Sequence, residues 1–119
     1  MPTFEKGAIV RVPFPYTDRN TQQRRPALVV SDGGVGEDGA LLWVVMITSA
    51  ENRAWPGDVS LGATFREAGL PVPSVVRPCK IATIEGRLAE PIGAIHPTLL
   101  RKVEDAIRLQ LGCATEPPA

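Results

Sequence analysis

The sequence is poor in the residues that hold metals and disulfides. It has one histidine and two cysteines, Cys79 and Cys113, with no Cys-x-x-Cys pair, so no zinc framework can be assembled. We expect no metal and no cofactor. A membrane-spanning helix needs a run of about 18 apolar residues, and the sequence has no such run. Residues 1–7 also lack the apolar core of a signal peptide. These absences predict a cytoplasmic protein with reduced thiols and no membrane contact.

An excess of either charge is also missing. Thirteen basic and thirteen acidic residues give a net charge of zero, which argues against coating nucleic acid through a bulk positive field. Any anionic ligand must therefore meet a local cluster. With 119 residues, of which 44% are hydrophobic, the chain is long enough for one compact domain. We expect that domain over residues 1–112 and a frayed tail over 113–119.

Short apolar and β-branched stretches dominate the chain. They are separated by glycine, proline and polar residues, which is typical of strands joined by turns. Leu41–Thr48 is apolar throughout and predicts a central strand buried on both faces. We expect the first strand to end, or to lie at a sheet edge, at Pro13 and Pro15, and we expect Pro78 to break a later strand. The predicted strands cover residues 8–14, 27–31, 41–48, 58–61, 74–77, 80–84 and 91–95.

The last part of the chain predicts a single amphipathic helix. Pro97 suits its first turn and Gly112 suits the position just past its end. One face carries apolar residues at helical spacing, namely Leu99, Leu100, Val103, Ala106, Ile107 and Leu111. His96 precedes the helix and suits a capping role better than a catalytic one, because the helix dipole disfavours an imidazolium there. The fold class is therefore mainly β (β-rich α+β), a small barrel of short strands closed by a helix.

The segment Arg19-Asn20-Thr21-Gln22-Gln23-Arg24-Arg25-Pro26 contains three arginines and no acid. It leads directly into the predicted strand over 27–31. A guanidinium is permanently charged, and its planar donors match a phosphate. We therefore expect an external anion to approach this segment.

Several stretches in this order resemble the MazF/PemK (Kid-like) toxins of type II toxin–antitoxin systems. The resemblance spans most of the chain, from Gly7 to Gly112. It rests on residues 7–10, 13–15, 24–30, 47–49, 74–78 and 80–84 and on the final helix. It implies an SH3-like barrel, a homodimer and metal-independent cleavage of single-stranded RNA through a 2′,3′-cyclic phosphate. It also implies a cognate antitoxin with an acidic disordered segment, and it leaves open DNA binding through the antitoxin complex.

The resemblance places a catalytic arginine at Arg25, where it would stabilise the phosphorane, and a functional threonine at Thr48. From residue type alone, Arg25 could instead be a solvated surface residue and Thr48 an ordinary strand end. Arg24 suits a contact to the RNA backbone or to solvent. Arg77 matches a catalytic arginine of the Kid branch, with an ion pair to one of the acids as the alternative.

Two further residues are candidates for RNA contacts. Ser74 could bind RNA or cap a turn, and the turn is favoured. Trp55 could stack on a base, as in single-strand binders, or anchor the antitoxin, or pack on the barrel.

The chain departs from the family at its acid–base positions. Where the Kid branch carries an aspartate, this sequence has Cys79. Where other members carry a histidine or glutamate, it has Arg19 and Asn20, which we assign to RNA contacts. Asp18 and Cys79 are the remaining candidates for a base, although an ordinary buried thiol is the simpler interpretation of Cys79. A third interpretation is that positioning and electrostatic stabilisation carry most of the rate.

The missing carboxylate keeps other functions open. A non-catalytic SH3-like module of a toxin–antitoxin locus would bind RNA or a peptide without turnover. A toxin acting on a protein target is the third hypothesis. Cleavage of a pure RNA in the presence of a chelator separates the three.

Overall fold

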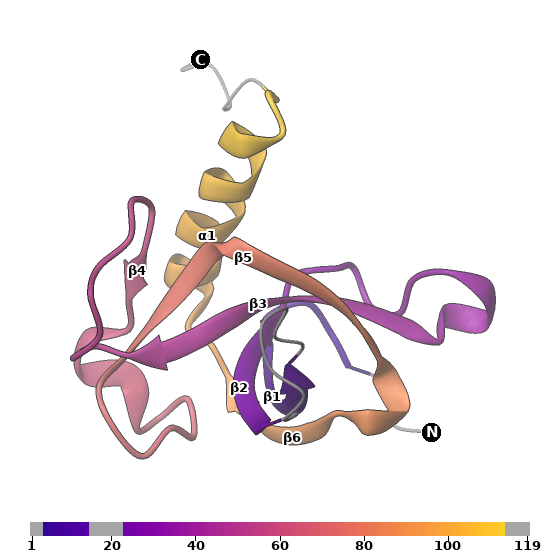
Figure 1. The fold of residues 1–119 in the computed structure, drawn as a ribbon, viewed down its shortest axis with the longest axis horizontal. Helices are drawn as coiled ribbons and strands as arrows, with labels where there is room; N and C mark the ends of the chain where they lie inside the picture. The colour runs from indigo at the N-terminus through magenta and orange to yellow at the C-terminus, as the bar shows by residue number, and fades with distance from the viewer. Residues whose placement is uncertain (1–3, 15–22, 114–119) are drawn as a thin grey trace.

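A curled antiparallel sheet and one helix make up the fold in the computed structural model, which describes residues 4–14 and 23–113 (Figure 1). The sheet has six strands in the order β4-β5-β3-β2-β1-β6. The strands are β1 (Ala8–Phe14), β2 (Gln23–Val29), β3 (Leu41–Ser49), β4 (Val59–Ser60), β5 (Ser74–Glu85) and β6 (Glu90–Ala94), and the helix is α1 (Pro97–Gln110). The prediction of a mainly β fold with a C-terminal helix is confirmed.

Apolar residues cover both faces of the sheet centre. In β1, Val10 and Val12 belong to one buried cluster, whereas Ile9, which precedes Val10, belongs to the other. This is the alternation that a strand imposes on its side chains. In β3, Val44 and Met46 face the first cluster, and Val45 and Ile47 face the second. The prediction that this strand is buried on both faces is confirmed, except at Trp43, which is 49% exposed.

The helix covers the second cluster. Val103 is fully buried there, and Leu99, Leu100 and Ile107 pack against the same cluster. The His96 side chain accepts a hydrogen bond from the Thr98 amide at 3.2 Å, which confirms its capping role. Gly112 follows the helix with a φ of 78°, a conformation that glycine adopts without strain.

Two predicted strand boundaries were wrong. Strand β2 begins at Gln23, so Arg25 lies inside the strand, paired with Val12 of β1, and Pro26 is not its first residue. Strand β5 runs through Pro78 as one element of 12 residues. The proline is accommodated in a register shift, because Val45 pairs with Ile81 while the next residue, Met46, pairs with Arg77.

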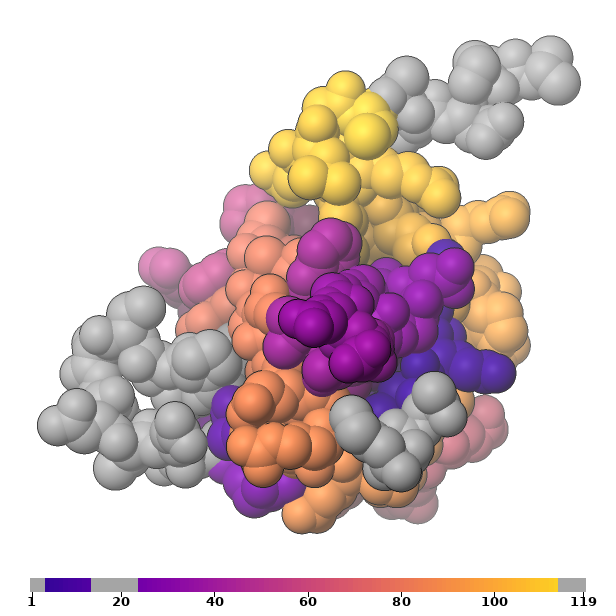
Figure 2. All heavy atoms as spheres, turned by 90° about the vertical axis from the view of Figure 1, so that its right-hand side faces the viewer, coloured from indigo at the N-terminus to yellow at the C-terminus, as the bar shows by residue number. Residues whose placement is uncertain are grey.

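The helix also differs from its prediction at one end. Leu111 was expected on the face packed against the sheet, but it is 72% exposed, and Leu109 is 66% exposed. In Figure 1 the C-terminal half of α1 extends beyond the strands. Figure 2 shows the same helix standing above the turn that joins β2 to β3. Within the described ranges, no helix is both long and apolar enough to cross a membrane.

Candidate functional site

A groove of about 600 Å³ lies where strands β2 and β3 separate. Its lining comes from β1, β2, β3 and β6, from the segment before β5 and from the first residue of β5. The lining residues are Arg11, Arg24, Arg25, Pro26, Ile47, Thr48, Ser49, Gly69, Leu70, Pro71, Val72, Ser74 and Ile92. Three of them are arginines, and none of these described lining residues is acidic. The groove is thus a local basic site on a chain with no net charge.

The sheet register brings Arg25 and Thr48 together. The pairing of β2 with β3 ends at Ala27 and Met46. The same antiparallel register, continued by two residues, puts Arg25 opposite Thr48. Side chains two residues apart on a strand share a face, so Arg25 and Thr48 lie on the face of Ala27 and Met46. The pairing ends just before these two residues, and both of them line the groove.

Thr48 is held by a neighbour in the following loop. The Asn52 side-chain amide donates a hydrogen bond of 2.6 Å to Thr48 Oγ1. Thr48 is 7% exposed, and Asn52 is exposed. Sequence analysis did not single out Asn52, because an asparagine in a polar loop has no distinguishing signal.

Arg11 is the second residue that sequence analysis missed. It pairs across the ladder with Pro26 of β2 and is exposed on the groove side. The sequence did contain a signal for the exposure of Arg11, because this residue stands between Val10 and Val12 in a predicted strand. A single charged residue between two apolar ones must point away from the core they share.

Arg24 has a carboxylate nearby, contrary to the expectation from its acid-free segment. It forms an ion pair of 2.8 Å with Glu90 of β6 and donates to the Leu88 carbonyl at 2.9 Å. Glu90 is 66 residues away in sequence but pairs with Arg11 in the sheet. Both side chains are well exposed, so the pair is weak and an incoming phosphate can compete for Arg24.

Ser74 is in the groove but is bonded locally. Its hydroxyl donates to the Val72 carbonyl at 2.8 Å, which agrees with the favoured turn-capping interpretation. Cys79 is exposed rather than buried, so the expectation of an ordinary buried thiol was wrong. Its sulfur lies 3.8 Å from the Pro56 carbonyl oxygen, and Cys79 is not among the residues that line the groove.

Arg77 and Trp55 lie outside the groove lining and contact each other. The Arg77 guanidinium stacks over the Trp55 ring at 4.3 Å from its centroid, and Lys80 lies 5.9 Å from the same ring. Arg77 also holds Asp58 through two hydrogen bonds of 3.1 Å and donates to the Arg53 carbonyl at 2.8 Å. The catalytic role of Arg77 and the stacking role of Trp55 stay predictions.

The ion pair is buried, with the Arg77 and Asp58 side chains 8% and 10% exposed. Burial alone would raise the pKa of Asp58. The hydrogen bonds from Arg77 and from the Trp55 amide, together with the charge of Arg77, outweigh that penalty and place the pKa of Asp58 below its ordinary value. The pair therefore stays charged at neutral pH and fixes the loop over residues 50–58 against β5.

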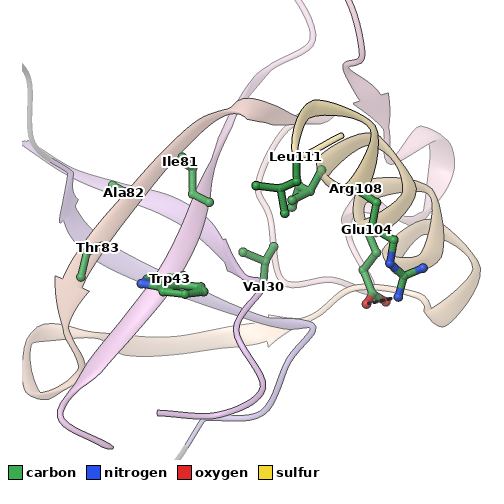
Figure 3. A pocket seen from close by; sticks show the side chains of 9 residues that line it. Val30, Trp43, Ile81, Ala82, Thr83, Glu104, Arg108 and Leu111 are labelled. Atoms are coloured by element: carbon green, nitrogen blue, oxygen red, sulfur yellow. Dashed lines mark ion pairs between the residues drawn. The ribbon is translucent and has the colours of Figure 1, made fainter. Parts of the chain in front are cut away.

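A second concave surface is apolar (Figure 3). Val30, Trp43, Ile81 and Leu111 point into the space between the sheet and the end of α1, and the Glu104–Arg108 ion pair lies at its rim. Ile81 is 54% exposed, and Leu111 and Trp43 are similarly open. We call this surface the Trp43 face. Exposed large apolar side chains gathered at one place are typical of protein contacts.

Other predicted site features lie elsewhere or cannot be placed. Asp18, Arg19 and Asn20 lie outside the described residues. The described ranges hold no group of three His, Cys, Asp or Glu side chains placed to bind a metal. Residues 34–39 have the spacing Gly-x-Gly-x-x-Gly, but they form a turn and a 3-10 helix of three residues, Glu37–Gly39. A dinucleotide site of this pattern requires the start of a full helix.

Comparison with known proteins agrees with this fold. The family described as PemK-like, MazF-like toxin of type II toxin–antitoxin system matches residues 5–111. A search among curated proteins found no match.

Among solved structures, the MazE–MazF complex of Deinococcus radiodurans contains a chain that is 25% identical, with a TM-score of 0.74, covering 96% of this chain and 100% of that one. MazF of the same organism is 23% identical, with a TM-score of 0.73 and coverage of 94% and 99%. An endoribonuclease in complex with its cognate antitoxin, from a mycobacterial species, is 20% identical, with a TM-score of 0.69 and coverage of 94% and 98%. The family match covers the β-sheet, the groove and the whole helix, and the chain therefore belongs to the PemK-like, MazF-like toxins of type II toxin–antitoxin systems.

Proposed function

We propose that the protein is an endoribonuclease that cleaves single-stranded RNA without a metal. The observation that carries the proposal is the placement of Arg25 and Thr48 on one face of the sheet, at the groove where β2 and β3 separate. Arg11 and Arg24 extend the positive charge along the same groove. A phosphodiester chain fits such a site because phosphate binding depends on fixed cations and hydroxyl donors.

The proposed reaction uses the RNA itself as nucleophile. The 2′-hydroxyl attacks the adjacent phosphorus, the bond from phosphorus to the 5′-oxygen breaks, and the products are a 2′,3′-cyclic phosphate and a 5′-hydroxyl. One proton leaves the 2′-oxygen and one is taken up by the 5′-oxygen. Arg25 and Thr48 would donate hydrogen bonds to the phosphoryl oxygens, where negative charge grows in the transition state.

The proton acceptor is not among the described residues of the groove. A guanidinium cannot act as a base, because its pKa lies above about 12. Cys79 is away from the groove lining, and Asp18 lies outside the described residues. We therefore favour a reaction in which positioning and electrostatic stabilisation supply most of the rate, with bulk water taking the proton.

The partners follow from the same surfaces. An acidic, disordered antitoxin segment would be attracted to the arginines of the groove and would fold on binding, which blocks RNA. The Trp43 face would pack against a second copy of the chain. Leu111 lines the apolar hollow and is itself exposed, so a two-fold axis can place the Leu111 of each copy against the hollow of the other. An mRNA substrate and an antitoxin partner both place the reaction in the cytoplasm.

The decisive assay uses purified protein, a mixed-sequence single-stranded RNA and EDTA. We expect cleavage with 2′,3′-cyclic phosphate and 5′-hydroxyl ends, and a loss of kcat of about 10²- to 10³-fold in Arg25→Ala, the usual cost of removing one oxyanion donor. Arg87→Ala is the matched control, since Arg87 is 65% exposed and pairs only with Glu85 among the contacts described. Full activity in Arg25→Ala would refute the assignment. RNA binding without any cleavage would instead support a non-catalytic module.

A further inference from the structure

The contact between Asn52 and Thr48 restricts the directions in which the Thr48 hydroxyl proton can point. A threonine hydroxyl carries one proton and two lone pairs. The Asn52 amide donates to Thr48 Oγ1 at 2.6 Å, so one lone pair is occupied and the hydroxyl proton must be directed elsewhere. Thr48 lines the groove and is 7% exposed, so a phosphoryl oxygen bound in the groove is an available acceptor for that proton. A hydroxyl held in this way is a ready donor to a phosphoryl oxygen.

We propose that Asn52 is a positioning residue of this enzyme, which acts by holding the Thr48 hydroxyl as a hydrogen-bond donor toward the scissile phosphate. The inference rests on the proposed ribonuclease function and adds a residue to it. Asn52 itself is not among the residues that line the groove, so it reaches the reaction only through Thr48. Without Asn52, the hydroxyl would rotate among several partners and donate to the phosphate only part of the time.

The loop that carries Asn52 is anchored on both sides of that residue. On one side, the Asn52 backbone amide donates to the Ser49 carbonyl at 3.1 Å. On the other side, Arg77 donates to the carbonyl of the next residue, Arg53, at 2.8 Å. Arg77 is in turn held by Asp58. This gives Arg77 a way to support the reaction without touching RNA, because it keeps the loop where Asn52 can reach Thr48.

A double-mutant cycle tests whether Asn52 works through Thr48. The four proteins are the wild type, Asn52→Ala, Thr48→Val and the double variant, each assayed with the same RNA in EDTA. In the wild-type background we expect Asn52→Ala to lower kcat about tenfold with little change in KM, because the residue does not touch the substrate. In the Thr48→Val background we expect less than about a twofold change, because the hydroxyl it positions is already gone.

Two measurements guard against a merely structural effect. Glu51→Ala alters the exposed neighbouring position of the same loop and should leave kcat within about twofold of the wild type. The thermal midpoint of Asn52→Ala should stay close to that of the wild type, since an exposed side chain is removed. A variant that loses activity only because it unfolds would fail this second measurement and overturn the inference.

The outcomes separate this inference from the proposed function. If the wild type cleaves RNA and Asn52→Ala is fully active, the positioning role is wrong and the ribonuclease stands. An equal loss from Asn52→Ala in both backgrounds also overturns the role, because the effect would not pass through Thr48. If the wild type does not cleave RNA at all, the proposed function fails and the positioning role fails with it.

Discussion

Replacing Asp58 with asparagine changes only a few atoms, but it should destabilise the folded protein strongly. The substitution keeps the size of the side chain but removes the charge that Arg77 faces. Arg77 is 6% exposed, so its guanidinium would remain buried but would lose the carboxylate with which it now pairs. The Asn side chain would also present a donor to the Arg77 donors in place of one of the two carboxylate oxygens.

The size of the effect follows from the burial. Breaking a buried ion pair by removing one partner costs roughly 3–5 kcal/mol, and we expect the lower end, about 3 kcal/mol, because Asn keeps one acceptor oxygen. For a chain of 119 residues, an unfolding entropy of about 2.1 cal/mol/K per residue gives about 250 cal/mol/K in total. The expected fall in the thermal midpoint is therefore about 12 °C.

Thermal and urea unfolding at equal protein concentration measure this loss. Glu85→Gln is the matched control, because it removes the acid of an exposed ion pair with Arg87 and should cost less than about 1 kcal/mol. The pH dependence supplies a second test. The pKa of Asp58 is lowered in the folded protein. Its contribution to the free energy of unfolding is therefore fully present above the unfolded pKa of about 4, and it is lost as the pH falls through the folded pKa.

The stability gap between the wild type and Asp58→Asn should therefore narrow as the medium becomes strongly acidic. A gap that widened on acidification would contradict the sign of the pKa shift. A variant within about 0.5 kcal/mol of the wild type at neutral pH would refute the reasoning that the pair holds the loop over 50–58 in place.

Two further predictions concern the partners. Ile81→Glu should convert a micromolar dimer into a monomer in sedimentation experiments, because it puts a charge into an apolar interface, whereas Ser60→Glu on the edge strand β4 should leave the dimer intact. A wild-type monomer would show that the Trp43 face does not pair. The affinity for an acidic antitoxin peptide should fall by roughly tenfold or more between 50 and 500 mM salt, because salt screens the attraction between the peptide and the groove arginines. Affinity that did not change with salt, measured by calorimetry, would refute an electrostatic groove.

Local sequence signals predicted the elements well where the structure depends on near neighbours. The helix bounds followed from Pro97 and Gly112, and the cap at His96 is made with a residue two positions later. The central strand followed from its continuous apolar residues. The extent of β5 did not follow, because a proline usually breaks a ladder and only the register shift opposite β3 accommodates Pro78.

The candidate site was harder to predict from the sequence, because its contacts join residues that are far apart in the chain. Arg24 lacks an acid among its neighbours in the sequence, yet the β1–β6 pairing brings Glu90 to it. An ion pair of Arg77 with an acid is one of the sequence-based alternatives, but the sequence does not indicate which acid. The partner, Asp58, is selected by the register of β4 on β5. Asn52 became visible only through its distance to Thr48, since residue type alone does not separate it from any other polar loop residue.

The groove combines two kinds of wall. Arg11, Arg25 and Thr48 stand on hydrogen-bonded strands, whereas Gly69 to Val72 belong to a segment outside the helices and strands. Pro71 and Val72 are exposed residues of that segment, so their exchange would reshape the surface proposed to meet the bases without moving the groups proposed to meet the phosphate. Under the proposed function, a single sheet would thus serve as a constant template on which different RNA sequence preferences arise by substitution at two exposed positions.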